Sequence, residues 1–391
     1  MKKTAFTLLA LSCLDLYANA TQFLTGSTYV NGAELGQVKE TEFILGVTGM
    51  ALNAKFRGTQ LNLNTGTQDY GHSSSKTTSL LPYGRIAKRY NDMVVFGVDV
   101  TQPFHSNLHW GANQVTRYAA VQVYLSDIDI SPKMAVNVSE KLSIAAGINL
   151  NFLQNNEINW AMPTGPGPSQ YATMTNKPAS YGTGFNVAFN AMLTQQDIFG
   201  MAYYSKINQR GRGYSRLGPL LSSSFINNFI LPATTELNYT HIFGPKWLTH
   251  WQLFHTQWEA NQTAPLYNTA NPMPSNFIFS LKYKASNAIM GLVRHQYNEK
   301  VGLGLVGVID AGPERENLRP ISFPSDTRYL LGIIADYKVN KTTTIEMLYG
   351  QGYSGTKLQN SLNIRGQTIP FTTGPVHINA NIVDFKVKIK R

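Results

Sequence analysis

The feature that most constrains the fold is a two-residue alternation of side-chain type between Lys141 and Phe152. One parity is apolar and the other is small or polar: Leu142, Ile144, Ala146, Ile148, Leu150 and Phe152 against Ser143, Ala145, Gly147, Asn149 and Asn151. Successive side chains of a strand point to opposite faces, so the stretch predicts a strand with one wholly apolar face. The pattern recurs at lengths near the ~9–11 residues that a tilted strand needs to cross a bilayer. We therefore predict an all-β fold, a transmembrane antiparallel β-barrel.

The recurring pattern predicts fourteen strands. They are expected at 56–64, 81–89, 93–101, a strand ending near 138, 141–152, 181–193, 198–207, 233–243, 247–258, 277–297, 301–309, 328–338, 343–353 and 377–390. The tenth is expected to be long and kinked, with a turn at Ser286-Asn287 as the alternative. Short and long connections alternate, as they do in outer-membrane barrels, and the even strand count puts both termini in the periplasm.

The chain begins like a secretory protein. Two lysines precede an apolar run from Ala5 to Leu14, and Ala18-Asn19-Ala20 is a small-x-small cleavage site, so residues 1–20 are expected to be a signal peptide cut near Ala20. A lipoprotein anchored at Cys13 is the alternative. Residues 21–55 show no clean alternation and are predicted to form a hatch, or plug, in the lumen of a barrel built from 56–391.

Composition narrows the possible partners. No stretch has the ~18 consecutive apolar residues of a membrane-spanning helix. The formal charge of +11 is spread along the chain, with no basic helix and no aromatic RNA-binding motif, so we expect no nucleic acid partner. Basic residues in loops and at strand ends would instead meet outer-membrane lipid and lipopolysaccharide. The predicted location is the bacterial outer membrane, which the chain crosses many times.

Seven segments stand out for their order and spacing: 117–119, 128–136, 141–149, 182–186, 231–234, Lys246-Trp247 and 324–332. Together they resemble the FadL/TodX family of outer-membrane transporters. The resemblance implies passive uptake, by a monomer, of long-chain fatty acids or of other hydrophobic compounds such as aromatic hydrocarbons. It further implies capture at extracellular loops, binding in the lumen and lateral release into the bilayer beside the third strand after the hatch shifts.

Two features depart from the family pattern. The hatch element Asn-Pro-Ala-Gly has its nearest match in Val47, Thr48, Gly49 and Met50, which keeps only the glycine and the residue after it. The chain also ends on Lys390-Arg391, whereas such barrels usually end on an aromatic residue.

Candidate ligand-binding residues are of two kinds. Arg117, Lys133 and Arg328 could bind a carboxylate; Lys133 and Arg328 lie close to aspartates, so salt bridges within the protein are the alternative. Long loops carry aromatic residues that could form an apolar capture patch or pack the loops together, namely Phe104, Trp110, Phe225 and Phe229. Gly97 and Asp99 mark the expected lateral opening, although Gly97 could simply ease strand curvature.

Other function classes are less well supported by the sequence. The eight histidines show no metal-ligand spacing, so we expect no metal and no cofactor. Nothing places a Ser, a His and an Asn together, which argues against a barrel enzyme such as a phospholipase. A general polar porin remains the main alternative, and loops that bind a host or phage could coexist with transport.

Overall fold

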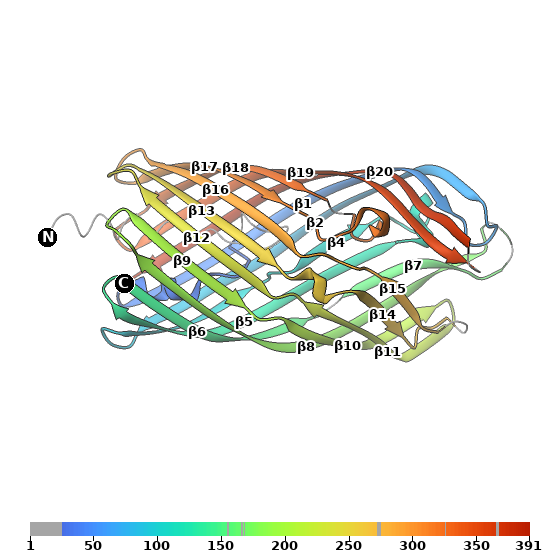
Figure 1. Ribbon diagram of the computed structural model, residues 1–391, viewed down its shortest axis with the longest axis horizontal. Coiled ribbons are helices and arrows are strands. Elements are labelled where there is room, and N and C mark those ends of the chain that lie inside the picture. Colours follow the sequence, from blue (N-terminus) through green and yellow to red (C-terminus); the bar gives the residue numbers. More distant parts are fainter. Residues whose placement is uncertain are drawn as a thin grey trace.

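The computed structural model describes residues 26–391 except 155, 166, 168, 272–274, 325 and 365–366. Its main body is a closed antiparallel barrel (Figure 1). The fourteen barrel strands are β1 (Thr41–Leu61), β2 (Gln68–Arg89), β3 (Val94–Thr101), β5 (Gln122–Ser139), β6 (Leu142–Leu153), β8 (Tyr171–Met192), β9 (Asp197–Tyr204), β12 (Thr234–Ile242), β13 (Trp247–Thr256), β16 (Ser286–Gln296), β17 (Val301–Asp310), β18 (Arg328–Lys338), β19 (Thr343–Ile364) and β20 (Gln367–Lys390). The proposed signal peptide lies outside the described residues.

The barrel closes where the first strand pairs with the last. The ladder of β1 and β20 runs from Glu42↔Lys390 to Gln60↔Thr372, and the other face of β1 pairs with β2. Closure leaves no edge whose backbone groups would be unpaired in a bilayer. The predicted fold class and the predicted number of strands are confirmed.

The first strand begins at Thr41 rather than at Phe56 as predicted. Its outward side chains, such as Phe43 and Leu45, are large, but further along they give way to Gly49 and Ala51, and this interrupts the apolar parity in the sequence. Residues 41–55 are therefore barrel wall, and the expected hatch boundary at residue 55 is wrong. Within the described residues, only 26–40 precede the wall.

The predicted tenth strand is two separate strands. β16 belongs to the wall, whereas β15 (Phe277–Ser280) pairs with β14 (Thr263–Tyr267) outside it. Lys282, between them, has φ 45°, a conformation that a strand cannot continue through. The strand count is unchanged because β15 does not belong to the barrel ladder.

The connections at one end of the barrel are all short, as predicted. Short turns lie at the end that holds the C-terminus, at 90–93, 140–141, 193–196, 243–246, 297–300 and 339–342. At the other end the sheet continues as an extension that also includes β4 (His105–His109), β7 (Glu157–Pro163), β10 (Ile207–Leu217) and β11 (Leu220–Leu231). Four short 3-10 helices complete the described elements: η1 (Gly32–Gln37), η2 (Val115–Tyr118), η3 (Trp258–Ala260) and η4 (Glu316–Leu318).

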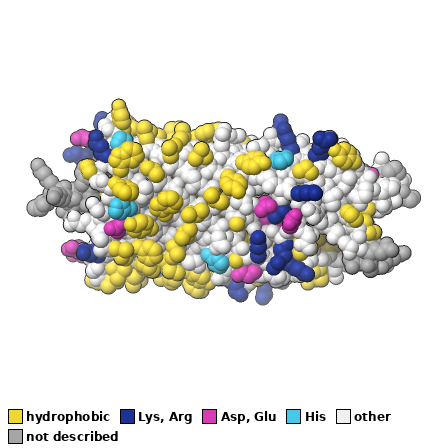
Figure 2. Space-filling model, turned by 45° about the horizontal axis from the view of Figure 1, so that its top comes forward, with side chains coloured by type: hydrophobic (Ala, Val, Ile, Leu, Met, Phe, Trp, Pro, Cys, Tyr) yellow, Lys and Arg dark blue, Asp and Glu magenta, His cyan; other side chains and the backbone are white. Residues whose placement is uncertain are grey.

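The outer surface of the wall is apolar. On the face shown in Figure 2, hydrophobic side chains cover the half nearer the short turns, and most Lys and Arg gather in the other half or at the rim. Alternate side chains point outward, for example Ile144, Ile148 and Phe185, while inward neighbours are buried: Ser143, Asn149 and Asn186. None of the described helices is long and apolar enough to cross a membrane.

Candidate functional site

The inward side chains of one half of the wall form an apolar cluster inside the barrel. They come from β1, β9, β12, β13 and β16 to β20 and pack against one another: Met50, Ile198, Ile242, Leu248, Phe254, Ala288, Met290, Leu292, Val306, Val308, Ile334, Leu348 and Ile382. Leu52 and Leu330 border this cluster and are only half-buried. A polar solute gains nothing from such a surface, whereas an apolar one does.

Two neighbouring stripes extend this cluster toward the extracellular end; we call them the apolar track. The register of β1 and β20 pairs their inward residues as Met50↔Ile382, Leu52↔Ala380, Ala54↔Ile378 and Phe56↔Val376. Ala54, Phe56 and Val376 belong to a second apolar cluster formed with Trp110, Leu108, Leu358 and Ile321. The apolar track therefore joins the loops to the middle of the lumen without a charged inward residue.

Trp110 is the predicted loop residue that meets the apolar track. Its side chain is 0% exposed, and its indole Nε1 donates a hydrogen bond to the carbonyl oxygen of Ile321 at 3.2 Å. The other predicted loop aromatics lie elsewhere: Phe104 and Phe229 pack in a third cluster with Tyr29, and Phe225 packs in a fourth. The structure thus does not bring the four residues together as one patch.

Toward the periplasmic end the apolar cluster gives way to buried ion pairs, which we call the charged layer. Arg294 Nη2 lies 2.7 Å from Asp336, and Lys386 Nζ lies 2.6 Å from Glu346. Glu42 contacts Lys388 at 3.3 Å, and Lys390 as well. Each pair joins inward residues of neighbouring or nearby strands. A hydrophobic molecule that reached this layer would have to displace charges that are already paired.

The three predicted carboxylate-binding cations all have acidic partners. Lys133 Nζ lies 2.7 Å from Asp99. Arg328 lies 2.7 Å from Asp310. Arg117 lies 3.5 Å from Asp69, and its guanidinium stacks on two tyrosine rings. Lys133 and Arg328 therefore form salt bridges within the protein, which was the alternative to ligand binding. Their partners are not the aspartates nearest in sequence.

The segment 26–40 lies in the lumen against β3, β5, β6 and β8. Leu35 of η1 is fully buried, and a Cβ placed at Gly97 of β3 would lie 2.9 Å from its Cδ2. Lys133 donates to the carbonyl oxygen of Val30 at 3.3 Å, and Arg89 donates to that of Gly36 at 2.7 Å. Gly97 thus provides room for Leu35 rather than lining an open gap.

The hatch element expected at Val47, Thr48, Gly49 and Met50 lies in the wall instead. All four belong to β1, where they pair with both β2 and β20. Thr48 faces the lumen and donates to Asp384 at 2.6 Å, and Met50 begins the apolar track. This correction follows from the early start of β1, since a residue paired on both sides cannot belong to a separate plug.

A seam interrupts the wall between β2 and β3. Their ladder ends at Gly84↔Val100, although β2 continues to Gln68. Pro103 follows the end of β3 and has no N–H to extend a ladder. The Gln102 side chain crosses the seam, because its Nε2 donates to the carbonyl oxygen of Pro82 at 2.9 Å. Asp99, expected near the opening, lies on the short-turn side of the seam and pairs with Arg85 and Lys133.

Side chains alone hold β4 against β2 above the seam. His105 Nε2 lies 2.7 Å from Ser79 Oγ, and Thr77 donates to the carbonyl oxygen of Asn107 at 2.7 Å. Burial lowers the pKa of His105 to about 4, because the charged imidazolium would lose its hydration there. The contact is therefore made by neutral histidine at neutral pH, and it has none of the strength of a backbone ladder.

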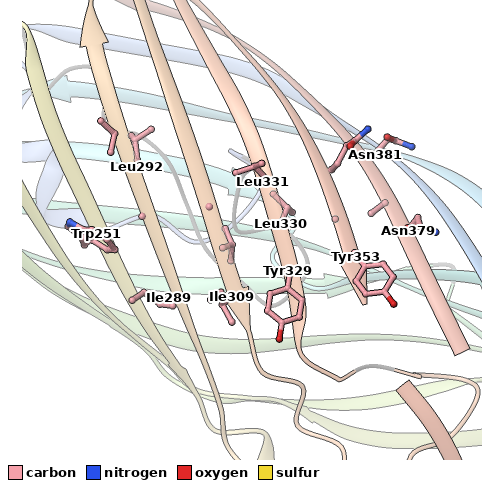
Figure 3. A pocket seen from close by; sticks show the side chains of 17 residues that line it. Trp251, Ile289, Leu292, Ile309, Tyr329, Leu330, Leu331, Tyr353, Asn379 and Asn381 are labelled. Atoms are coloured by element: carbon pink, nitrogen blue, oxygen red, sulfur yellow. The ribbon is translucent and has the colours of Figure 1, made fainter. Parts of the chain in front are cut away.

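A hollow of about 940 Å³ lies along β13 and β16 to β20, but on the outer surface (Figure 3). Its exposed lining side chains, such as Ile309, Tyr329 and Leu331, point away from the lumen. Gly291 and Gly307 contribute no side chain to the same face, which leaves the wall thin there. Since this surface faces the bilayer, we assign the hollow to lipid contact and the ligand path to the apolar track.

Comparison with known proteins agrees with this architecture. The family model for outer membrane protein transport proteins (OMPP1/FadL/TodX) matches residues 17–378. The solved structure of a Pseudomonas aeruginosa FadL homologue has 16% identity and a TM-score of 0.83, over 96% of this chain and 95% of that one. The Pseudomonas putida toluene transporter TodX has 14% identity and a TM-score of 0.66, over 93% and 94%.

The Ralstonia pickettii toluene transporter TbuX also has 14% identity, with a TM-score of 0.63 over 92% of both chains. No curated protein sequence matches the chain. At these identities the solved structures establish the shared fold, while the family model covers nearly the whole sequence. The chain, with its closed barrel, its apolar lumen and this match, belongs to the OMPP1/FadL/TodX family of outer-membrane transport proteins.

Proposed function

We propose that this protein carries hydrophobic small molecules passively across the outer membrane along the apolar track and releases them sideways into the bilayer. The observation that carries the proposal is the continuity of inward apolar residues from Phe56 and Val376 to Met50 and Ile382. Each methylene that leaves water gains about 0.8 kcal/mol, so such a surface favours apolar solutes over the polar ones that a porin passes. The segment 26–40 in the lumen also speaks against an open polar channel.

Uncharged compounds suit this path better than fatty acids do. Arg117, Lys133 and Arg328 each have an aspartate partner, so a ligand carboxylate would have to displace it. The TodX and TbuX structures are of toluene transporters, and aromatic hydrocarbons are the class that we propose first. Long-chain fatty acids are the second class, because the apolar track is suited to an acyl chain, whereas these three cations already have acidic partners.

The exit that we propose is the seam between β2 and β3. The charged layer lies at the periplasmic end of β1 and β16 to β20, and the segment 26–40 covers the inner side of β3, β5, β6 and β8. At the seam, by contrast, the Gln102 side chain takes the place of a backbone ladder. An apolar molecule leaving there would enter lipid without meeting water, which is the favourable direction for it.

Two glycines give a matched test of the path. Gly352 faces the lumen, where an added Cβ would lie 3.4 Å from Ala380, whereas at Gly307 an added Cβ would meet only a backbone oxygen 4.0 Å away, on the outer side. Uptake of radiolabelled toluene and of oleate is measured in cells that make the wild type, Gly352→Phe or Gly307→Phe. We expect Gly352→Phe to lose most uptake and Gly307→Phe to retain it, with toluene faster than oleate. Normal uptake by Gly352→Phe, or passage of a sugar through the wild type, would overturn the proposal.

A further inference from the structure

A row of arginines lies on the outer surface of β10, in the extension beyond the barrel wall. Every second residue from Asn208 to Arg216 is exposed, and three of these are Arg210, Arg212 and Arg216, which we call the arginine stripe. The residues between them point inward: Gln209 is buried and donates to Asn151 at 2.8 Å. The arginine stripe therefore faces away from the lumen.

The stripe differs from the buried arginines of the barrel, each of which has an acidic partner. Within the described part of the chain, no aspartate or glutamate pairs with any of its members, whereas Arg85, Arg294 and Arg328 are all paired. Lys177, opposite Tyr214 in the ladder, is already bound to Glu157. Like charges spaced two residues apart on one strand face repel each other, so the stripe favours an external anion.

The stripe begins where the apolar outer surface ends. Arg212 is opposite Ala179 of β8, and two residues further toward the bilayer Tyr181 is 76% exposed. Phe185 and Val187 continue the outward apolar face from there. Tyrosine and tryptophan mark the level of lipid head groups in membrane proteins. The arginines thus lie just beyond that level, since β10 lies in the half of the molecule away from the short turns (Figure 1).

We propose that the arginine stripe binds the phosphate groups of lipid A, the anchor of lipopolysaccharide in the outer leaflet. Guanidinium groups bind phosphate through two parallel hydrogen bonds, and arginine keeps its charge at any physiological pH. A phosphorylated lipid at this height places its phosphates beside Arg210 and Arg212 and its acyl chains along Tyr181 and Phe185. The inference concerns the outer surface and does not rest on the proposed transport path.

The test measures binding of purified Kdo2-lipid A to the full-length protein in detergent by native mass spectrometry. The variant Arg210→Gln/Arg212→Gln/Arg216→Gln removes the stripe. The matched control Lys246→Gln/Lys300→Gln/Lys341→Gln removes the same charge from exposed periplasmic turns. A third variant changes the three arginines to lysine, which keeps the charge. Heat-modifiable migration on gels shows whether each variant folds.

We expect at least tenfold weaker binding for the glutamine variant, unchanged binding for the turn variant and partial recovery for the lysine variant. Removing the phosphates from lipid A should weaken its binding to the wild type as much as the glutamine variant weakens binding of intact lipid A. Equal binding by the glutamine variant and the wild type would overturn the proposal, as would equal weakening by the turn variant. Equally tight binding of phosphatidylglycerol would show that the stripe accepts any anionic lipid, and would overturn the assignment to lipid A.

Discussion

The contact between Leu35 and Gly97 offers the sharpest test of whether the segment 26–40 acts as a plug. Leu35 is 0% exposed and packs in a cluster with Ala33, Val38 and Val95, so Leu35→Ala removes buried methyl groups and leaves a cavity. Such changes cost about 2–5 kcal/mol of stability. If the barrel itself stays intact, this loss weakens only the docking of the segment in the lumen. At about 3 kcal/mol, and with a factor of ten for every 1.4 kcal/mol, the undocked population rises roughly 150-fold.

The assay is single-channel conductance of refolded protein in a planar bilayer. We expect rare openings for the wild type and far more frequent ones for Leu35→Ala, with the same conductance in each opening because the barrel is unchanged. Leu45→Ala is the control, since Leu45 is 73% exposed on the outer face of β1. Openings of Leu35→Ala that are no more frequent than those of Leu45→Ala would refute the reasoning, as would steady conductance by the wild type.

Two further predictions concern the seam. In the variant Ser79→Cys/His105→Cys, a short bifunctional thiol reagent should link β2 to β4 and slow toluene uptake. The same reagent should not slow uptake by either single variant. Unchanged uptake by the double variant would argue for an exit elsewhere. The pKa of His105 is lowered on folding, so the unfolded state binds the extra proton, and stability of this contact is lost as pH falls from about 6.5 towards 4. Hydrogen exchange at 105–109 should therefore be faster for the wild type than for His105→Gln at pH 5 and similar at pH 7.5, and equal rates at pH 5 would contradict it.

The wall was predictable because its physical requirements act locally. A strand that separates lipid from lumen must alternate apolar side chains with small or polar ones. This period of two is visible in stretches such as 141–152 and 301–309 without knowing which strands pair with them. The short turns and the closed, even-numbered barrel followed from the same pattern. Where the outward residues are small, as at Gly49 and Ala51 of β1, the signal weakened and the prediction started the strand too late.

The apolar track could be seen only once strands were paired. Met50, Leu52, Ala54 and Phe56 alternate in the sequence, but only their register with β20 shows that they join one continuous surface. The partners of the buried cations were likewise decided by the fold. Asp99 lies on another strand than Lys133, and Asp310 on another than Arg328, so no sequence spacing indicates either pair.

The sequence by itself determined that this chain is an outer-membrane barrel. A bilayer offers no water to the backbone or to the outward side chains, so each strand must pair its backbone groups and carry an apolar outward face. Only the tertiary structure decided what the lumen and the outer rim can bind. That depends on side chains far apart in sequence, such as Leu35 against Gly97 or Arg212 above Tyr181, whose proximity is set by strand register and closure.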